Sequence, residues 1–210
     1  MSLRPPGRGG SLAIVLHTHM PFVLGHGTWP FGEEWLWEAI ATSYLPLLDL
    51  LDSGAQLTMS VTPVVADQLE DPKTYELCRN FLRELRPTTH ALDEEEERAR
   101  GREDVAKAVR HSAAVYEDAA ERWDELDGDL LGAWAQHAVW TSSATHEVLP
   151  LAAVDGAVRM QLETGIASHR RRFESWNGGL WLPECGHAPW LDRLLACLLY
   201  TSPSPRDLST

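Results

Sequence analysis

Short apolar segments alternate with longer stretches of helical character along most of this chain, and that alternation restricts the folds open to it. Each apolar segment is a predicted strand, and the first and the fourth have the composition of buried strands. The segments cover residues 12–16, 56–65, about 135–146 and 178–186, and the strand in the second segment is expected to stop near Pro63. The early alanines of the third segment leave a helix possible there. Strands alternating with helices predict an α/β fold, with a parallel sheet or barrel of βα units.

Helices are predicted between these segments. Residues 33–51 have apolar residues at helical spacing, and Gly54 follows them as a stop signal. Residues 151–173 end in three arginines, which suit the negative end of a helix dipole. Another helix starts at about residue 190. Residues 73–132 form a helical insertion, and its acidic run at 93–97 is most simply a solvated helix face.

Composition restricts the partners and the compartment. The 210 residues are 44% hydrophobic, enough for one domain or most of one. A net charge of -13 argues against nucleic acid and anionic membranes as partners. The sequence contains neither an apolar run of membrane-spanning length nor a signal-peptide core, and its three cysteines lack metal spacing. We therefore expect a cytoplasmic protein, and the sequence leaves its oligomeric state open.

The two ends of the chain differ from the rest. Residues 1–10 are expected to be disordered. From residue 200 the composition changes to that of coil and resembles translated sequencing adapter. We expect residues 197–210 to be a non-native tail, and residues 11–196 to be the front part of a longer domain.

Polar residues follow the predicted strands. His17 and His19 come directly after the first apolar run and, two apart, should share a face at the strand's carboxyl end. Sites of parallel α/β folds are built at that end. The two imidazoles suit either a divalent metal or hydrogen bonds to a polar substrate. His146, at the end of the third segment, is a candidate third group.

Glu184 lies at the end of the fourth segment, whose sequence is GGLWLPECG. A charge at the tip of a buried strand is a candidate for chemistry. Strand parity places Leu180, Leu182 and Glu184 on one face, opposite Trp181 and its alternate neighbours. If the two leucines fill a barrel interior, Glu184 emerges at the barrel's mouth.

Tryptophan is abundant, with nine residues, and suggests a substrate class. Trp29 lies in a loop-like, glycine-rich segment, whereas Trp35 and Trp37 fall in the predicted helix and are expected to pack in the core. Aromatic rings in loops above a carboxylate suit the C–H faces of sugar rings. Trp29 is therefore a candidate sugar platform.

Four segments in order, HTHMP (17–21), HGTWPFGEEW (26–35), TSSATH (141–146) and LWLPEC (180–185), resemble the successive motifs of glycoside hydrolase family 57. The second is especially similar to the 1,4-α-glucan branching enzymes of that family. The resemblance covers residues 12 to about 196. It implies an incomplete (β/α)7 barrel, of which this sequence would contain only about four strands.

The resemblance also implies roles for individual residues. Glu184 would be the nucleophile of a retaining reaction on α-1,4-glucans, without cofactor or metal. His17, His19, His146, Trp29 and Trp181 would contact the substrate. Retaining chemistry needs a second carboxyl group about 5–5.5 Å from the first. In this family it is an aspartate on a later strand, for which these residues offer no counterpart, so the fragment alone is expected to have little activity.

Other functions remain open at this point. The same family contains α-amylases and 4-α-glucanotransferases, and Glu147 stands where branching enzymes usually have glycine. A metal-dependent polysaccharide deacetylase would use the histidine pair as ligands, but an Asp-Asp pair is expected before it and is not found. A non-catalytic glucan-binding domain would explain the missing acid/base group.

Overall fold

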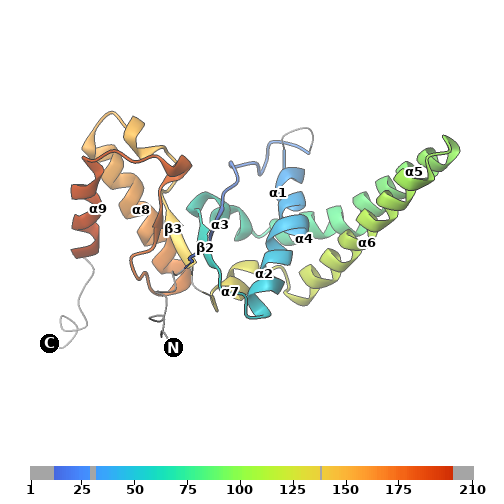
Figure 1. Cartoon of the computed structure of the whole chain (residues 1–210), viewed down its shortest axis with the longest axis horizontal. Helices are drawn as coiled ribbons and strands as arrows, with labels where there is room; N and C mark the ends of the chain where they lie inside the picture. Colours follow the sequence, from blue (N-terminus) through green and yellow to red (C-terminus); the bar gives the residue numbers. More distant parts are fainter. Residues whose placement is uncertain (1–11, 29–31, 138, 201–210) are drawn as a thin grey trace, which may run out of the picture.

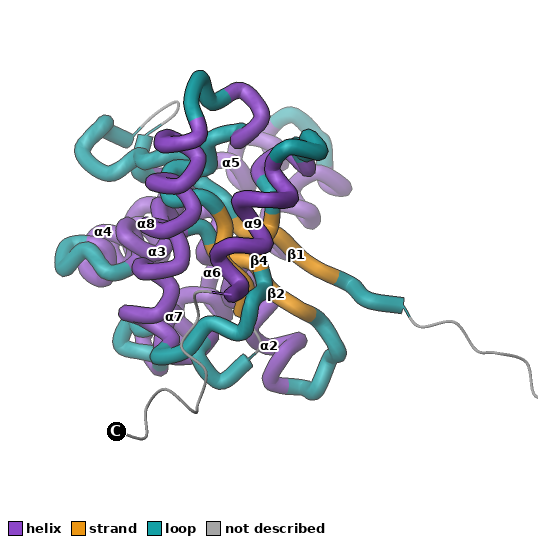
Figure 2. The backbone as a smooth tube through the Cα atoms, turned by 90° about the vertical axis from the view of Figure 1, so that its left-hand side faces the viewer, coloured by secondary structure: helices purple, strands orange, loops and turns teal. Residues whose placement is uncertain are grey.

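In the described part of the chain, a parallel four-stranded sheet is bent into part of a barrel. The computed structural model describes residues 12–28, 32–137 and 139–200. The strands, paired in chain order, are β1 (Val15–Thr18), β2 (Thr58–Val61), β3 (Val139–Ser142) and β4 (Leu180–Trp181). Figure 2 shows them as neighbouring orange segments with helices around them. The predicted α/β class and the partial barrel of about four strands are confirmed.

The first strand lies later in the sequence than predicted and is not buried on both faces. Leu12 is 86% exposed, Ile14 44% and Leu16 37%. Among the described residues β1 pairs only with β2 and forms an edge of the sheet, so the apolar residues around its start lack a covering neighbour. The apolar run correctly indicated a strand, but whether that strand is buried depends on the strands and helices beside it.

The first crossover is a continuous helix. It comprises α1 (Glu34–Ala39), a π-helical turn (Ile40–Tyr44) and α2 (Leu45–Asp52). The chain then turns at Gly54, whose φ of 91° suits glycine. This agrees with the helix predicted at 33–51. Trp37 is buried as expected, but Trp35 is 45% exposed, because the core-facing positions of the helix fall on Leu36, Trp37 and Ile40.

The second strand ends before Pro63, as predicted, but the helix α3 (Pro63–Leu69) that follows it was not predicted. Pro63 stands in the first turn of this helix, where a missing N–H costs nothing because that group has no helical partner. The proline that ends β2 therefore also begins α3. The strand itself keeps only Thr58–Val61.

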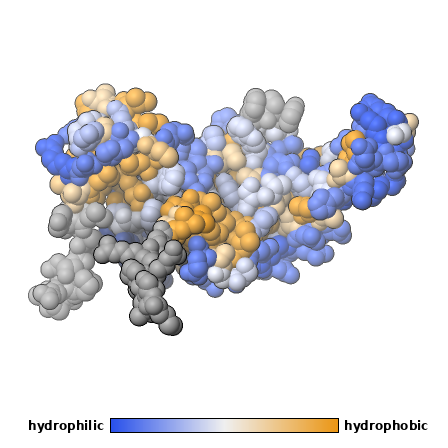
Figure 3. Space-filling view, viewed as in Figure 1, coloured by the Kyte–Doolittle hydropathy of each residue, from blue (hydrophilic) through white to orange (hydrophobic). Residues whose placement is uncertain are grey.

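The segment predicted to be a helical insertion is helical, and its two longest helices project as an arm (Figure 1). It contains α4 (Thr74–Asn80), a π-helical turn (Phe81–Leu85), α5 (Arg86–Ala99), α6 (Glu103–Glu125) and α7 (Leu130–Trp134). The acidic run lies on the exposed side of α5, as predicted, and forms ion pairs such as Glu94 with Arg110. Figure 3 shows a largely hydrophilic surface at the arm's tip.

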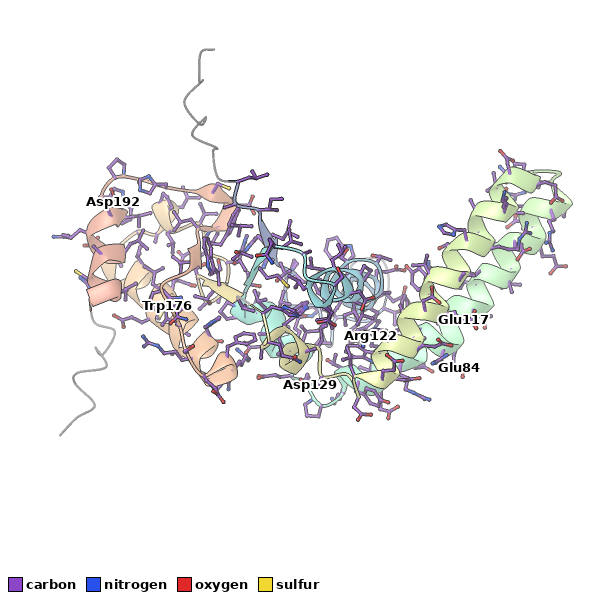
Figure 4. The ribbon with its side chains drawn as sticks, turned by 60° about the horizontal axis from the view of Figure 1, so that its bottom comes forward. Glu84, Glu117, Arg122, Asp129, Trp176 and Asp192 are labelled. Carbon is purple, nitrogen blue, oxygen red and sulfur yellow. The ribbon has the colours of Figure 1, made fainter. Side chains whose placement is uncertain are left out.

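The base of the arm is joined to the first crossover by an arginine. Arg122 of α6, labelled in Figure 4, forms ion pairs with Asp49 at 3.1 Å and with Asp52 at 2.9 Å, both on α2. In the interior, α6 contributes Trp123, which is fully buried and donates its indole N–H to the Tyr75 carbonyl. Apolar burial and surface ion pairs therefore both stabilise the base of the arm.

The last crossover and the segment after it differ in detail from the prediction. Helix α8 (Asp155–Phe173) is preceded by a 3₁₀ turn (Leu149–Leu151), and α9 spans Leu191–Tyr200. Helical structure thus continues past residue 197, where the tail was expected to begin. Residues 1–10 and 201–210, with their predicted disorder and coil, lie outside the described residues. The basic end of α8 forms tertiary pairs: Arg172 contacts Asp67 of α3 at 2.5 Å and Glu70, which caps that helix, at 2.6 Å.

The fourth predicted strand is mostly not a strand. Only Leu180–Trp181 pairs with β3, and a 3₁₀ turn (Pro183–Cys185) follows. Leu180 and Leu182 pack against the helix-side cluster of Leu149, Val158, Leu162, Leu191 and Leu194. The side chains of the two leucines therefore lie on the helix-covered face of the sheet, not in a barrel interior. Parity placed Leu180 and Leu182 together correctly, but a buried parallel strand is apolar on both faces, so parity did not show which face was inside.

Candidate active site

Three imidazole rings meet at the carboxyl ends of the strands. His17 lies in β1, His19 follows that strand, and His146 follows β3. The ring centroids of His19 and His146 are 3.6 Å apart with planes 7° from parallel, and those of His17 and His146 are 5.1 Å apart. The structure therefore brings together three residues that the sequence pattern indicated separately.

Trp181 completes this group from β4. Its ring stacks on His17 with centroids 5.2 Å apart and planes at 16°. β1 and β4 lie at opposite edges of the sheet, and neighbouring strands are about 4.8 Å apart. Side chains from the two edges can meet only because the sheet is strongly curved. The site is therefore the concave face of the partial barrel.

Glu184 lies in the turn after β4. Its backbone has φ 53° and ψ 24°, and Cys185 also has positive φ. The strand parity applied to Glu184 is therefore wrong, because the extended backbone ends before it. The carboxyl group is exposed, and its charge acts on His146. Consecutive non-glycine residues at positive φ are strained, and such strain often accompanies functional sites.

One predicted site residue is not described by the structure, and two residues that were not predicted lie next to the histidines. Trp29, the predicted sugar platform, falls in residues 29–31, which lie outside the described residues. Ser60 and Thr62, which the sequence pattern did not bring forward, lie behind the histidines: Ser60 Oγ is 3.1 Å from His17 Nδ1, and Thr62 Oγ1 is 3.4 Å from His19 Nδ1. A signal was available in the sequence TMSVT (58–62), where polar residues alternate with apolar ones.

The loop that carries His146 is held by a buried glutamine. His146 has φ 60°, uncommon for a residue with a Cβ. Gln161 of α8 accepts a hydrogen bond from the Thr145 N–H at 3.0 Å and donates one to Thr145 Oγ1 at 2.8 Å. Its own carbonyl accepts from the Ala144 N–H. These contacts fix the backbone immediately before His146.

Replacing Gln161 with methionine should destabilise the chain by about 1–3 kcal/mol, because the Thr145 groups lose their partners. Urea unfolding would measure the loss, and the ring resonances of His146 should shift. The control is Met160→Leu at the adjacent, 61% exposed position, which should change stability by less than about 0.5 kcal/mol. Equal effects of the two substitutions would show that Gln161 has no special role.

The histidines are held neutral. Burial, with the neighbouring imidazoles second, lowers the pKa of His17 to about 4. Burial and His146 lower the pKa of His19 to about 4 as well. Burial also lowers the pKa of His146, and the charge of Glu184 partly opposes that shift. At neutral pH the cluster can exchange hydrogen bonds with a ligand without adding positive charge.

This predicts a loss of stability in mild acid. Below the ordinary histidine pKa of 6.5 the unfolded chain takes up protons that the folded site accepts only near pH 4. The stability that the neutral histidines contribute to the folded state is fully present above pH 6.5 and is lost as the pH falls towards 4. Urea unfolding across this range should show the decline, and His19→Asn should reduce its slope. NMR titration of His17 and His19 with midpoints near 6.5 would contradict the prediction.

Two observations on the described residues concern metal binding and membrane-spanning helices. No group of three or more His, Cys, Asp or Glu side chains there is arranged to hold a metal ion. The stacked histidines present ring faces to one another, whereas metal ligation uses lone pairs in the ring planes. Within the same residues, none of the helices has both the length and the apolar character needed to cross a membrane.

The fold is that of an α/β-barrel type of protein, with the candidate site residues at the carboxyl ends of parallel strands. The chain belongs to glycosyl hydrolase family 57, whose family model matches residues 13–200. The family resemblance inferred from the sequence motifs is thereby confirmed.

Individual relatives support the same family. The chain is 38% identical over 193 residues to the 1,4-α-glucan branching enzyme TK1436 of Thermococcus kodakarensis, matching 86% of this chain and 28% of that protein. It is 31% identical over 209 residues to the probable 1,4-α-glucan branching enzyme Rv3031 of Mycobacterium tuberculosis, matching 87% of this chain and 39% of that one. The chain therefore spans well under half the length of these relatives.

Solved structures give the same result. The GH57-type branching enzyme from Pyrococcus horikoshii superposes with a TM-score of 0.76 at 37% identity, over 84% of this chain and 35% of that one. The α-amylase AmyC from Thermotoga maritima superposes with a TM-score of 0.75 at 27% identity, over 89% and 38%. The fold is thus shared by relatives named for different activities.

Proposed function

We propose that this chain supplies the nucleophile and part of the sugar-binding site of a retaining enzyme acting on α-1,4-glucans. The observation that carries the proposal is the cluster of neutral imidazoles and Trp181 beside Glu184, on the concave face of the sheet. The activity we favour is 1,4-α-glucan branching in glycogen or related polysaccharide metabolism. The names of the branching-enzyme relatives described above support this choice.

In the proposed reaction the Glu184 carboxylate attacks the anomeric carbon of the donor glucan. The bond to the leaving oxygen breaks, a glycosyl ester forms on Glu184, and the leaving oxygen takes a proton from a second carboxyl group. A glucan hydroxyl then displaces Glu184, and the second group accepts that hydroxyl's proton. We propose that the second group belongs to a part of the enzyme outside these 210 residues, since the chain spans only 28–39% of the curated relatives' lengths.

The remaining site residues would bind the sugar. His17, His19 and His146 would exchange hydrogen bonds with sugar hydroxyls, and Trp181 would offer its ring face. Trp29 is retained as a glucan platform on sequence grounds alone. Because these imidazoles are neutral, they do not pair with Glu184 as cations would, and its negative charge remains available for attack.

The α-amylase of Thermotoga maritima makes hydrolysis the second candidate. The two activities differ in whether water or a glucan hydroxyl resolves the glycosyl ester, and this depends on how well the acceptor side excludes water. We also propose that the protein is cytoplasmic. Cys78, Cys185 and Cys197 are all free thiols, as expected in a reducing compartment.

Three measurements test the proposal. The purified chain should bind maltoheptaose, with shifts at Trp181 and the three histidines, and should not bind cellohexaose; no maltoheptaose binding would refute the glucan assignment. Incubated with amylose, the chain should form few or no branches. Branching at an ordinary enzymatic rate would show that the second carboxyl group lies within these residues. Stoichiometric zinc retained after dialysis would instead favour a metal-dependent deacetylase.

A further inference from the structure

Ser60 lies at the centre of the sheet, behind the histidine cluster. It is fully buried, and its register partners are His17 on β1 and Trp140 on β3. Its hydroxyl oxygen is 3.1 Å from His17 Nδ1 and 3.3 Å from the Thr141 carbonyl oxygen. The hydroxyl therefore lies between an imidazole nitrogen and a carbonyl group.

Proton accounting favours one arrangement of these three groups. The Thr141 carbonyl can only accept a hydrogen bond, whereas the Ser60 hydroxyl has one proton to donate and lone pairs to accept with. If Ser60 donates to Thr141, His17 must donate from Nδ1, and both contacts are hydrogen bonds. If Ser60 donates to His17 instead, its lone pairs face the carbonyl oxygen in a buried place, which is unfavourable.

The arrangement extends to the next ring. His17 Nε2 lies 3.0 Å from His146 Nε2, and a hydrogen bond there requires one proton between the two nitrogens. A neutral His17 that carries its proton on Nδ1 has a bare Nε2. His146 must then carry its proton on Nε2 and donate it to His17. The Nδ1 atom of His146 is left without a proton and becomes an acceptor.

We propose that Ser60 is a positioning residue that fixes the tautomers of His17 and His146. Hydrogen bonds run in one direction, from His146 Nε2–H to His17, from His17 Nδ1–H to Ser60, and from Ser60 to the Thr141 carbonyl. The site then presents His146 Nδ1 as an acceptor for a ligand hydroxyl. This last consequence rests on the proposed glucan-binding function; the tautomers do not.

The test is the ¹⁵N NMR spectrum of the imidazoles in the full 210-residue chain at pH 7 without ligand. We expect the protonated-nitrogen shift at His17 Nδ1 and at His146 Nε2, and the unprotonated shift at the other nitrogen of each ring. The opposite tautomer in either ring would overturn the proposal. This measurement needs no variant, so it is decisive even if replacing a buried serine prevents folding.

Two serine-to-alanine substitutions extend the test. Ser60→Ala should convert both rings to tautomer mixtures, whereas Ser142→Ala should leave them unchanged. Ser142 is the matched control because it is equally buried on β3 and donates to the Trp181 carbonyl, not to an imidazole. Restoration of the native tautomers by Ser60→Thr, which keeps a hydroxyl, would support the role. Unchanged tautomers in a folded Ser60→Ala chain would refute it.

Maltoheptaose binding distinguishes a failure of this proposal from a failure of the proposed function. Ser60→Ala should weaken maltoheptaose binding about three- to tenfold, as expected for one hydrogen bond. If the native tautomers are as stated but maltoheptaose does not bind, the glucan function fails and the tautomer assignment stands. If maltoheptaose binds equally well to a folded Ser60→Ala chain with altered tautomers, the proposed acceptor role of His146 Nδ1 is wrong.

Discussion

Glu184→Gln is expected to abolish covalent labelling of this chain by α-maltosyl fluoride. Fluoride leaves without a proton, so the reagent needs a nucleophile but not the second carboxyl group. In the native chain the bond from the anomeric carbon to fluorine breaks, a bond to Glu184 forms, and the ester accumulates because no base activates water. The amide should react at least about a thousandfold more slowly, roughly 4 kcal/mol in activation free energy.

Intact-mass and peptide mass spectrometry would measure this labelling. The matched control is Glu147→Gln, at the carboxylate that follows His146 in the sequence, and it should be labelled like the native chain. A maltosyl group found on Glu147, or on any residue other than Glu184, would disprove the assignment of the nucleophile. A native chain that binds maltoheptaose but is never labelled would favour a non-catalytic glucan-binding role.

Gly165→Ala is expected to have the largest effect on folding. Gly165 lies on α8 where the helix crosses β3, and a Cβ there would fall 2.2 Å from the Ser142 carbonyl oxygen. The backbone of a central strand cannot move aside easily, so helix and strand must separate. We expect a loss of about 1–3 kcal/mol or more. The shift should also disturb the His146 loop, which the same helix holds through Gln161.

The same substitution elsewhere on α8 provides the control. Gly156 lies in the first turn of the helix, and a Cβ there would meet nothing within 4 Å. Gly156→Ala should therefore stabilise the chain, by at most about 1 kcal/mol, through helix propensity. Urea unfolding of the two variants would compare them. If Gly165→Ala were as stable as Gly156→Ala, the close contact of α8 with β3 would be wrong.

Most strand and helix positions could be predicted because their signals are local. The glycine at 54 and the alternation of apolar segments with helices act within a few residues, and the structure agrees with them. The errors arose where a local signal had two meanings. Pro63 was correctly taken as the end of a strand, but the helix that it begins was missed, and Leu16 is apolar yet lies on an edge strand.

The candidate site was predictable in its residue types but not in its contacts. His17, His19 and His146 could be selected because polar residues at strand ends mark sites in parallel folds. The role of Trp181 came only from the family resemblance, and Ser60 was missed because a small polar residue in an apolar strand gives a weak signal. The contact of Ser60 with His17 depends on the register of two strands 43 residues apart in the sequence.

The sequence by itself determined the α/β class, the helical insertion, the family and most of the residues gathered at the site, because composition, periodicity and motif order are properties of the chain alone. Only the tertiary structure decided which face of β4 is concave, that the backbone turns at Glu184, and that Trp181 reaches His17 across the sheet. Curvature and register are properties of the assembled sheet. They arise when strands distant in sequence pair and bend together, and no local pattern encodes them.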